Sequence, residues 1–162
     1  MSHVRYIDKT REYYRAEGYD TPYRWAHFDD IPFTPLAKPL SACRVGLITT
    51  GEMAIRDAPL PVADDDPLRD PYWLPMDTPI ERLYSRKTAY DRFATTLDDV
   101  DAYLPITRLR EAVTEGLIAA LAPRFQMAFS QYSQRKTLKV DAPRILDWLR
   151  EDRVDVAVLT AV

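Results

Sequence analysis

Two short, continuously apolar segments constrain the fold of this chain more than any other feature. The first reads Arg-Val-Gly-Leu-Ile-Thr-Thr from Arg44 to Thr50, and the second reads Val-Asp-Val-Ala-Val-Leu-Thr-Ala-Val from Val154 to Val162. Runs of this length, rich in β-branched residues, are typical of strands that are buried on both faces of a parallel sheet. The sequence therefore predicts an α/β fold.

Helical patterns separate these strands. Apolar residues at helical spacing predict one helix that opens at Pro105 and is ended by Pro123, and a second helix that Asp141 caps. We also expect a strand from Arg124 to Ser130 and a weaker one within Ile80–Ala89. A helix, a short turn and a buried strand in that order indicate a βαβ crossover. The expected fold class is a doubly wound α/β domain with a mostly parallel sheet.

By composition the chain divides into an aromatic, proline-marked arm of residues 1–40 and a domain of residues 41–162. In the arm, a short helix over residues 8–17 is expected, with Asp8 as its N-cap and Gly18 as its terminator. So many aromatic side chains should pack on something, either on their own domain or on another subunit. In the domain, the proline-rich residues 51–79 are expected to form a long irregular loop.

Charge and composition exclude several classes of function. The formal net charge of the 162 residues is −3, and no block of one sign indicates a nucleic-acid or polybasic membrane surface. No apolar run approaches the roughly 18 residues that span a bilayer, and the N-terminus has no signal-peptide core. We therefore expect a cytoplasmic protein. Cys43 is the single cysteine, and we expect it to be inert.

The carboxyl edge of the sheet is where a doubly wound domain binds its ligands. Gly51 follows the first predicted strand and Val162 ends the last one, so both should lie at that edge, and we expect the sheet to be incomplete at its C-terminus. The side chains of Thr49, Thr50 and Thr160 could donate hydrogen bonds to a ligand there. The β-propensity of threonine is the simpler explanation of their presence.

Nine short stretches carry a resemblance to a known family. They are Arg44–Thr50, Tyr90-Asp91, Leu104-Pro105-Ile106, Leu109-Arg110, Glu115-Gly116, Leu121-Ala122-Pro123-Arg124, Leu149-Arg150-Glu151-Asp152, Val154-Asp155 and Leu159-Thr160. In this order and spacing they resemble the selenoprotein B-type subunits of the glycine, sarcosine, betaine and D-proline reductase family. The proportions of the chain fit the D-proline reductase selenoprotein subunit best.

The resemblance implies where the redox centre lies. In the family the Leu-Thr-containing strand runs into Sec-x-x-Cys or Cys-x-x-Cys, so a selenocysteine or cysteine is expected directly after Val162. An unrecognised UGA codon or a deliberate truncation would explain an end at that point. The chain would then be the N-terminal portion of a selenol- or thiol-dependent reductase subunit, inactive alone and with no cofactor of its own.

The resemblance also implies the chemistry and the partners. Such a subunit takes part in the reductive cleavage of a carbon–heteroatom bond in an amino acid or a related small molecule. A pyruvoyl group on a partner subunit would hold the amine, a thiol would donate the electrons, and the subunits would form an oligomer. Selenocysteine is expected in the full-length protein.

Departures from the family pattern define further candidates. Arg86 and Lys87 stand where the family often has Ser-His, and Phe125 stands where it often has His. If Lys87 is buried, it could donate a proton, whereas a solvated lysine would not. The substrate-binding candidates, which include residues that resemble the family pattern, are Thr49, Thr50, Tyr90, Asp91, Arg124 and Thr160. For Asp91 a turn cap, and for Arg124 a surface ion pair, are the alternatives.

Two other classes of function remain open. A non-catalytic binding or assembly module would dock a partner through the aromatic arm. A metal-dependent hydrolase would use the acidic residues 64–66 with Asp98, Asp99 and Asp101. Acidic turns ahead of a helix are also common as helix caps, so we expect no metal site.

Overall fold

The computed structural model describes residues 5–21, 27–31, 34–62, 69–87, 93–130 and 133–162. The chain divides into two compact units, Met1–Phe33 and Thr34–Val162. This boundary lies ahead of the expected one at residue 40, and one ion pair helps to explain why. Lys38 Nζ lies 2.8 Å from Asp155 Oδ2, which ties the end of the expected arm to the larger unit.

The smaller unit contains one described helix, α1 (Tyr6–Ala16). Gly18 ends it as predicted, with φ +88°, because its N–H donates to the Arg15 carbonyl while the Tyr19 N–H donates to the Tyr14 carbonyl. This is the double hydrogen bond of a Schellman motif. The predicted N-cap is wrong, because Asp8 lies inside the first turn and pairs with Arg5 at 2.7 Å. There an acidic side chain still favours the helix dipole.

The larger unit alternates strands and helices. Its described strands are β1 (Arg44–Thr49), β2 (Met53–Ile55), β3 (Tyr72–Pro75), β4 (Leu83–Ser85), β5 (Ala120–Leu121), β6 (Arg124–Met127) and β7 (Val156–Thr160). Its described helices are α2 (Ile106–Thr114), α3 (Gln134–Lys136) and α4 (Ala142–Glu151), with 3-10 turns at Leu40–Ala42, Ile80–Arg82 and Val100–Ala102 and a π-helical turn at Thr137–Asp141. Among the described residues, no helix is both long and apolar enough to cross a membrane.

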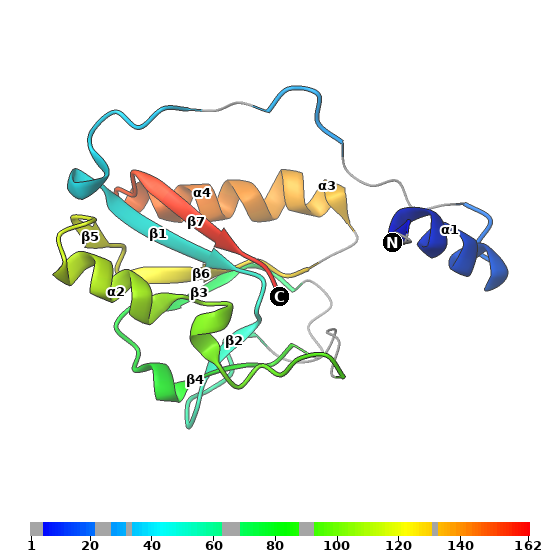
Figure 1. Cartoon of the computed structure of the whole chain (residues 1–162), viewed down its shortest axis with the longest axis horizontal. Helices are drawn as coiled ribbons and strands as arrows, with labels where there is room; N and C mark the ends of the chain where they lie inside the picture. The colour runs from blue at the N-terminus through cyan, green and yellow to red at the C-terminus, as the bar shows by residue number, and fades with distance from the viewer. Residues whose placement is uncertain (1–4, 22–26, 32–33, 63–68, 88–92, 131–132) are drawn as a thin grey trace, which may run out of the picture. The chain divides into compact units, whose positions relative to one another are not determined.

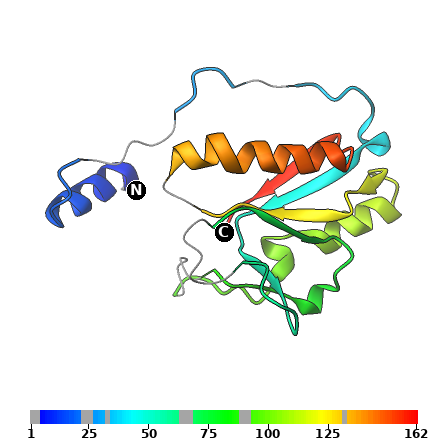
Figure 2. The same ribbon diagram turned by 180° about the vertical axis from the view of Figure 1, so that it is seen from behind.

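β1 lies at the centre of the main sheet (Figures 1 and 2). Val45 faces both Leu121 of β5 and Val156 of β7, so β5 and β7 lie on opposite edges of β1. β6 pairs with the end of β1, and all three of these pairings are parallel. β3 adds an antiparallel strand beside β6, while β2 and β4 form a separate two-stranded sheet. The predicted mostly parallel α/β sheet is confirmed.

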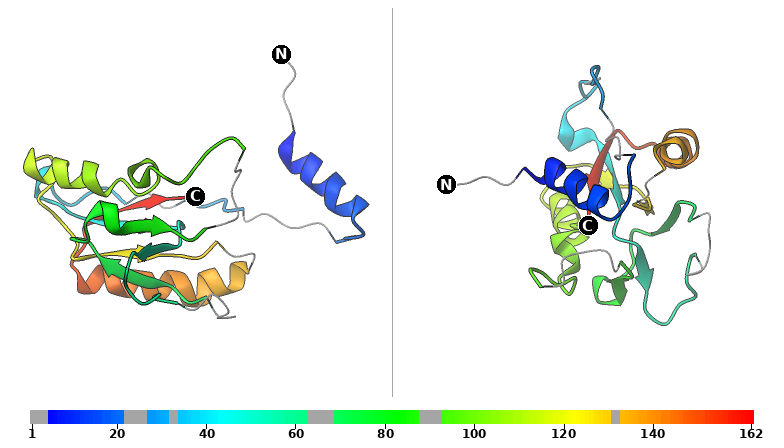
Figure 3. Two further views of the ribbon diagram at one scale, coloured as in Figure 1. Left: turned by 90° about the horizontal axis from the view of Figure 1, so that it is seen from below. Right: turned by 90° about the vertical axis from the view of Figure 1, so that its right-hand side faces the viewer.

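Helices cover both faces of this sheet, with α2 on one side and α3 and α4 on the other (Figure 3). The core under α2 consists mainly of large apolar side chains, including Leu47, Leu74, Leu104, Ile106, Phe125 and Met127. On the other face, α4 approaches β1 so closely at Gly46 that any side chain there would require neighbouring side chains to shift. A Cβ at Gly46 would lie 2.7 Å from Leu149 Cδ2 and 3.1 Å from Val154 Cγ1.

α2 ends earlier than the apolar spacing predicts. It stops at Thr114, and Gly116 follows with φ +73°. The N–H of Gly116 donates to the Val113 carbonyl and that of Leu117 to the Ala112 carbonyl, again as in a Schellman motif. The prediction of a helix up to Pro123 is therefore wrong, because the glycine terminator prevails over the continued leucine spacing.

The predicted irregular loop over residues 51–79 is wrong in part. It contains β2 and also β3, in which Tyr72 and Leu74 point into the core while Trp73 and Pro75 are exposed. This alternation fits an edge strand, which tolerates a proline because its outer N–H groups need no partner. The weak strand expected within Ile80–Ala89 is confirmed as β4, and the strand expected from Arg124 is confirmed as the shorter β6.

The last helix begins before its predicted cap. The Ser133 hydroxyl accepts a hydrogen bond from the Lys136 N–H and caps α3, while Asp141 lies buried within the continuous helical segment. Its carboxylate instead pairs with Lys136 Nζ at 2.5 Å. Pro143 has no N–H to donate to the Lys139 carbonyl, and a wider π-helical turn occurs at this point.

Substitution of Gly46 tests the close approach of α4 to β1. We expect Gly46→Val to lower the free energy of unfolding by about 1–3 kcal/mol, because its methyl groups must displace Leu149 and Val154 in a packed interface. Urea unfolding followed by circular dichroism measures the change, with Gly46→Ala as the smaller step. Equal stability of the valine variant and the unmodified protein would contradict this packing.

Candidate functional site

The carboxyl ends of β1 and β7 are bound together beyond their ladder. The Thr50 N–H donates to the Thr160 carbonyl at 3.2 Å, and the Val162 N–H donates to Thr50 Oγ1 at 3.1 Å. The Thr160 hydroxyl donates to the Ile48 carbonyl at 3.4 Å. The structure therefore brings the predicted candidates Thr50 and Thr160 to one edge of the sheet, next to Thr49.

These three threonines differ in what their hydroxyl groups contact. Thr49 is fully buried, and its Oγ1 accepts a hydrogen bond from the Gly51 N–H at 3.1 Å, which shapes the turn after β1. The Thr160 hydroxyl also contacts the backbone, because it donates a hydrogen bond to the Ile48 carbonyl. Thr50 is only partly buried, and its oxygen accepts from Val162. Among the three, Thr50 is the one best placed to reach a ligand.

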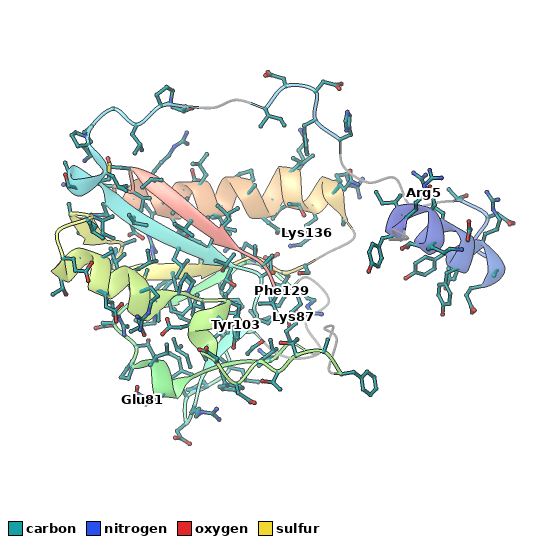
Figure 4. The ribbon with its side chains drawn as sticks, viewed as in Figure 1. Arg5, Glu81, Lys87, Tyr103, Phe129 and Lys136 are labelled. Atoms are coloured by element: carbon teal, nitrogen blue, oxygen red, sulfur yellow. The ribbon has the colours of Figure 1, made fainter. Side chains whose placement is uncertain are left out.

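Lys87 is a buried lysine at the same edge (Figure 4). Only 7% of its surface is exposed, and its ammonium donates to Ser130 Oγ at 2.8 Å and to the Thr50 carbonyl at 3.4 Å. Its backbone N–H donates to Ser85 Oγ, which in turn donates to the Gly51 carbonyl at 2.6 Å. The end of β4 is thereby fixed against the turn that follows β1, and it holds Lys87 in place.

Burial lowers the pKa of Lys87 below its ordinary value, because the charged form loses its hydration. The negative charge of Glu52 partly offsets this effect, and Arg69 adds to it. Glu52 is itself paired with Arg69, whose Nη2 lies 2.8 Å from Glu52 Oε2. Among the residues that the structure describes, no carboxylate forms an ion pair with Lys87. Its hydrogen-bond partners within the described part of the chain are neutral oxygen atoms.

Arg124 lies at the start of β6. Because β6 runs parallel to β1, Arg124 is at the amino ends of these strands, whereas Thr50 is at their carboxyl ends. Its Nε donates to Asp152 Oδ2 at 2.8 Å and its Nη2 to Glu151 Oε2 at 2.6 Å, so it fastens the end of α4. The hydrogen bond to Asp152 is the main reason that the pKa of Arg124 is raised. Its guanidinium group also stacks over the Trp73 ring. The structure does not bring Arg124 to the carboxyl ends of β1 and β7, where Thr50 and Thr160 lie.

The remaining sequence candidates occupy other places. Tyr90 and Asp91 lie outside the described residues. Phe125 is fully buried in the core under α2. Arg86 donates to the Val62 carbonyl at 2.9 Å. Cys43 is buried ahead of β1, with its Sγ 3.4 Å from the Pro39 carbonyl oxygen.

The acidic turn before α2 caps helical segments, as the sequence suggested. Asp99 Oδ1 accepts a hydrogen bond from the Asp101 N–H, and Asp101 Oδ1 accepts one from the Thr107 N–H. Asp64, Asp65 and Asp66 fall outside the described residues. Within the described part of the chain, no group of three or more histidine, cysteine, aspartate or glutamate side chains is placed to hold a metal ion.

Sequence reasoning missed two members of this edge, Ser130 and Glu52. Ser130 ends the segment that was predicted as a strand, so the rule that ligands lie beyond strand ends could have found it. No sequence pattern would have placed Glu52 at this site, because its position depends on a turn in which it adopts φ +49°. Tyr72 also lies nearby and donates to the Met53 carbonyl at 2.7 Å, and burial raises its pKa.

Comparison with known proteins supports one family. A family model described as "Glycine/sarcosine/betaine reductase selenoprotein B (GRDB)" matches residues 3–162. A "Glycine reductase complex component B subunit gamma" of Symbiobacterium thermophilum is 24% identical over 149 residues, which are 91% of this chain and 35% of that protein. The chain thus spans about a third of the length of this relative. No solved structure matches it.

Replacement of Lys87 by Met tests whether burial of the ammonium group destabilises the folded protein. At neutral pH we expect Lys87→Met to raise the free energy of unfolding by about 1 kcal/mol, because an apolar side chain needs no hydration. The folded-state pKa of Lys87 lies below its unfolded value, so folded protein releases this proton first as pH rises. Stability of the unmodified protein relative to the variant should then increase towards pH 10.5.

Urea unfolding of both proteins at a series of pH values measures this difference. Lys139 provides the matched control, because it is an exposed lysine in the π-helical turn Thr137–Asp141 that precedes α4. Lys139→Met should leave the pH dependence unchanged. A constant stability difference between Lys87→Met and the unmodified protein across this range would contradict the lowered pKa.

Proposed function

The chain belongs to the glycine/sarcosine/betaine reductase selenoprotein B family, and we propose that it is the N-terminal portion of a selenol- or thiol-dependent reductase subunit. Membership of this family of reductase components supports an oxidoreductase role. The proposed reaction is the reductive cleavage of a carbon–heteroatom bond in an amino acid or a related small molecule. The proposed position of the redox residue is directly after Val162.

One observation carries this proposal: the end of β7 is bound to Thr50 beside the buried ammonium of Lys87. Ligands of parallel α/β sheets bind beyond the carboxyl ends of the strands. A residue that follows β7 would start within reach of Thr50, whose carbonyl oxygen accepts from Lys87. A nearby positive charge favours the anionic form of a thiol or selenol, and that form is the nucleophile.

The residues of this chain would have distinct roles. A selenol or thiol at the proposed position would supply the nucleophile, and a pyruvoyl group on a partner subunit would hold the amine. The two reducing electrons would be released when this residue and the thiol donor join in a selenenyl sulfide or a disulfide. Lys87 donates a proton to the departing group, a task for which a lowered pKa is suited. Thr50 holds the end of β7 through its Oγ1. Tyr90 and Asp91 remain proposed substrate contacts.

The proposed setting is cytoplasmic and oligomeric. The name of the Symbiobacterium relative describes that protein as a component of a complex, which supports reductase subunits as partners of this chain. We also propose a thiol as the electron donor. Selenocysteine in the full-length protein is consistent with the selenoprotein family.

A non-catalytic assembly module is the second candidate. α1 has no buried residue, and the exposed fractions of Tyr6 and Tyr13 are 77% and 61%. Aromatic side chains are frequent at the centres of protein interfaces. A helix that displays them would dock a partner without any redox chemistry in this chain.

The complete protein, purified with its partner subunits, tests the reductase proposal. We expect thiol-dependent cleavage of a carbon–nitrogen bond in at least one of glycine, sarcosine, betaine and D-proline. It is measured as release of ammonia or an amine from the first three and as ring opening of D-proline. Lys87→Gln should lower kcat by about 10²-fold, because a positioned proton donor is lost. The loss should be largest at the pH where the unmodified lysine is protonated.

Lys139→Gln is the matched control, since it removes an equal charge from an exposed position. Full activity of Lys87→Gln would remove Lys87 from the mechanism. If none of the four substrates is cleaved, the reductase proposal fails. Loss of partner binding after Tyr6→Ala and Tyr13→Ala, in a protein without reductase activity, would then favour the assembly module.

A further inference from the structure

The ammonium group of Lys87 has more hydrogen-bonding capacity than its neighbours in the described part of the chain use. Its three N–H bonds point in different directions, and the described partners are Ser130 Oγ at 2.8 Å and the Thr50 carbonyl at 3.4 Å. The second of these distances is long for a hydrogen bond. Both partners are uncharged, so a buried positive charge is held without an anion from the described residues.

Two hydroxyl groups beside this ammonium are able to donate. Ser130 Oγ accepts from Lys87, and Thr50 Oγ1 accepts from the Val162 N–H, so the proton of each hydroxyl is available for a further acceptor. Ser130 is exposed, which gives a ligand access from solvent. Ammonium and hydroxyl donors that lie together favour a ligand with several acceptor oxygens.

We propose that Lys87, Ser130 and Thr50 form a receptor for the carboxylate group of a small molecule at the carboxyl edge of β1. The inference rests on the proposed function for its biological meaning, because it assigns to this edge the acidic end of the substrate.

The local charge favours a monoanion. Lys87 supplies one positive charge, and Glu52 lies close enough to influence it while being neutralised by Arg69 at 2.8 Å. A carboxylate therefore cancels the charge that burial makes costly. A phosphate dianion would add a second negative charge near Glu52.

Calorimetric titration with sodium acetate tests the receptor in the full chain. We expect acetate to bind the unmodified protein at pH 7 and to raise its Tm. Lys87→Gln should bind acetate at least tenfold more weakly and show no acetate-dependent rise in Tm. Methylammonium chloride, a cation of similar size, should not bind. Acetate remains ionised from pH 7 upward, so weaker binding at high pH reports the loss of the lysine charge, with Glu52 and Arg69 as its charged neighbours.

Two further variants keep the test decisive. Ser130→Ala removes an exposed hydroxyl, so we expect the protein to fold and its acetate affinity to fall several-fold. Lys139→Gln removes a remote positive charge and should leave the affinity unchanged. Equal acetate binding by the unmodified protein and Lys87→Gln would overturn the proposal. Binding of phosphate without binding of acetate would also overturn it.

The outcome is separable from that of the proposed function. Acetate binding that depends on Lys87, in a complete protein without thiol-dependent cleavage, would keep the receptor and refute the reductase. Cleavage activity without any Lys87-dependent acetate binding would keep the reductase and refute the receptor.

Discussion

The hydrogen bonding of β1 along both of its edges is the constraint on which the rest of the larger unit depends. Residues Val45–Thr49 pair with β7 on one side, while β5 and β6 share the other side. Leu47 and Thr49 are fully buried, and Gly46 permits the close approach of α4. A strand held on both edges and both faces has little freedom to move, so the turn that follows it is fixed as well. The ends of β6 and β7 are thereby brought together at one edge.

The lysine at this edge works against the packing that holds it. A buried ammonium that has no carboxylate partner among the described residues is destabilising, and an apolar residue at position 87 would suit the fold better. Ser85 and the turn at Gly51 nevertheless hold the lysine backbone in place through two hydrogen bonds. Natural proteins commonly retain such locally unfavourable groups where a ligand or a reaction requires them. This conflict between stability and placement is the physical reason for regarding the edge as a functional site.

The sheet was predictable from the sequence to the extent that its strands carry their own signal. β1 and β7 are continuous apolar runs, and both were found. The predicted burial on both faces is wrong for β7, whose residues are only partly buried and whose Leu159 is exposed, because among the described strands it pairs with β1 alone. β3 was missed because its alternating residues Tyr72–Leu74 lie in a segment rich in proline and aspartate. The end of α2 was missed because leucine spacing continues past Gly116. Lys87 was predicted as a candidate only on the condition of burial. The hydrogen bond from Lys87 to Ser130 could not be predicted, because tertiary packing brings together two residues that are 43 positions apart in the sequence.

The central claim is that a buried ammonium, unneutralised by the described residues, lies at the carboxyl edge of β1. The most direct measurement is an NMR titration of the Lys87 side chain, observed at its ε-carbon and assigned by comparison with Lys87→Met. The account predicts a titration midpoint below 10.5, the ordinary value for lysine, because burial disfavours the charged form. A midpoint at or above 10.5 would show a solvated or ion-paired ammonium and would contradict the account.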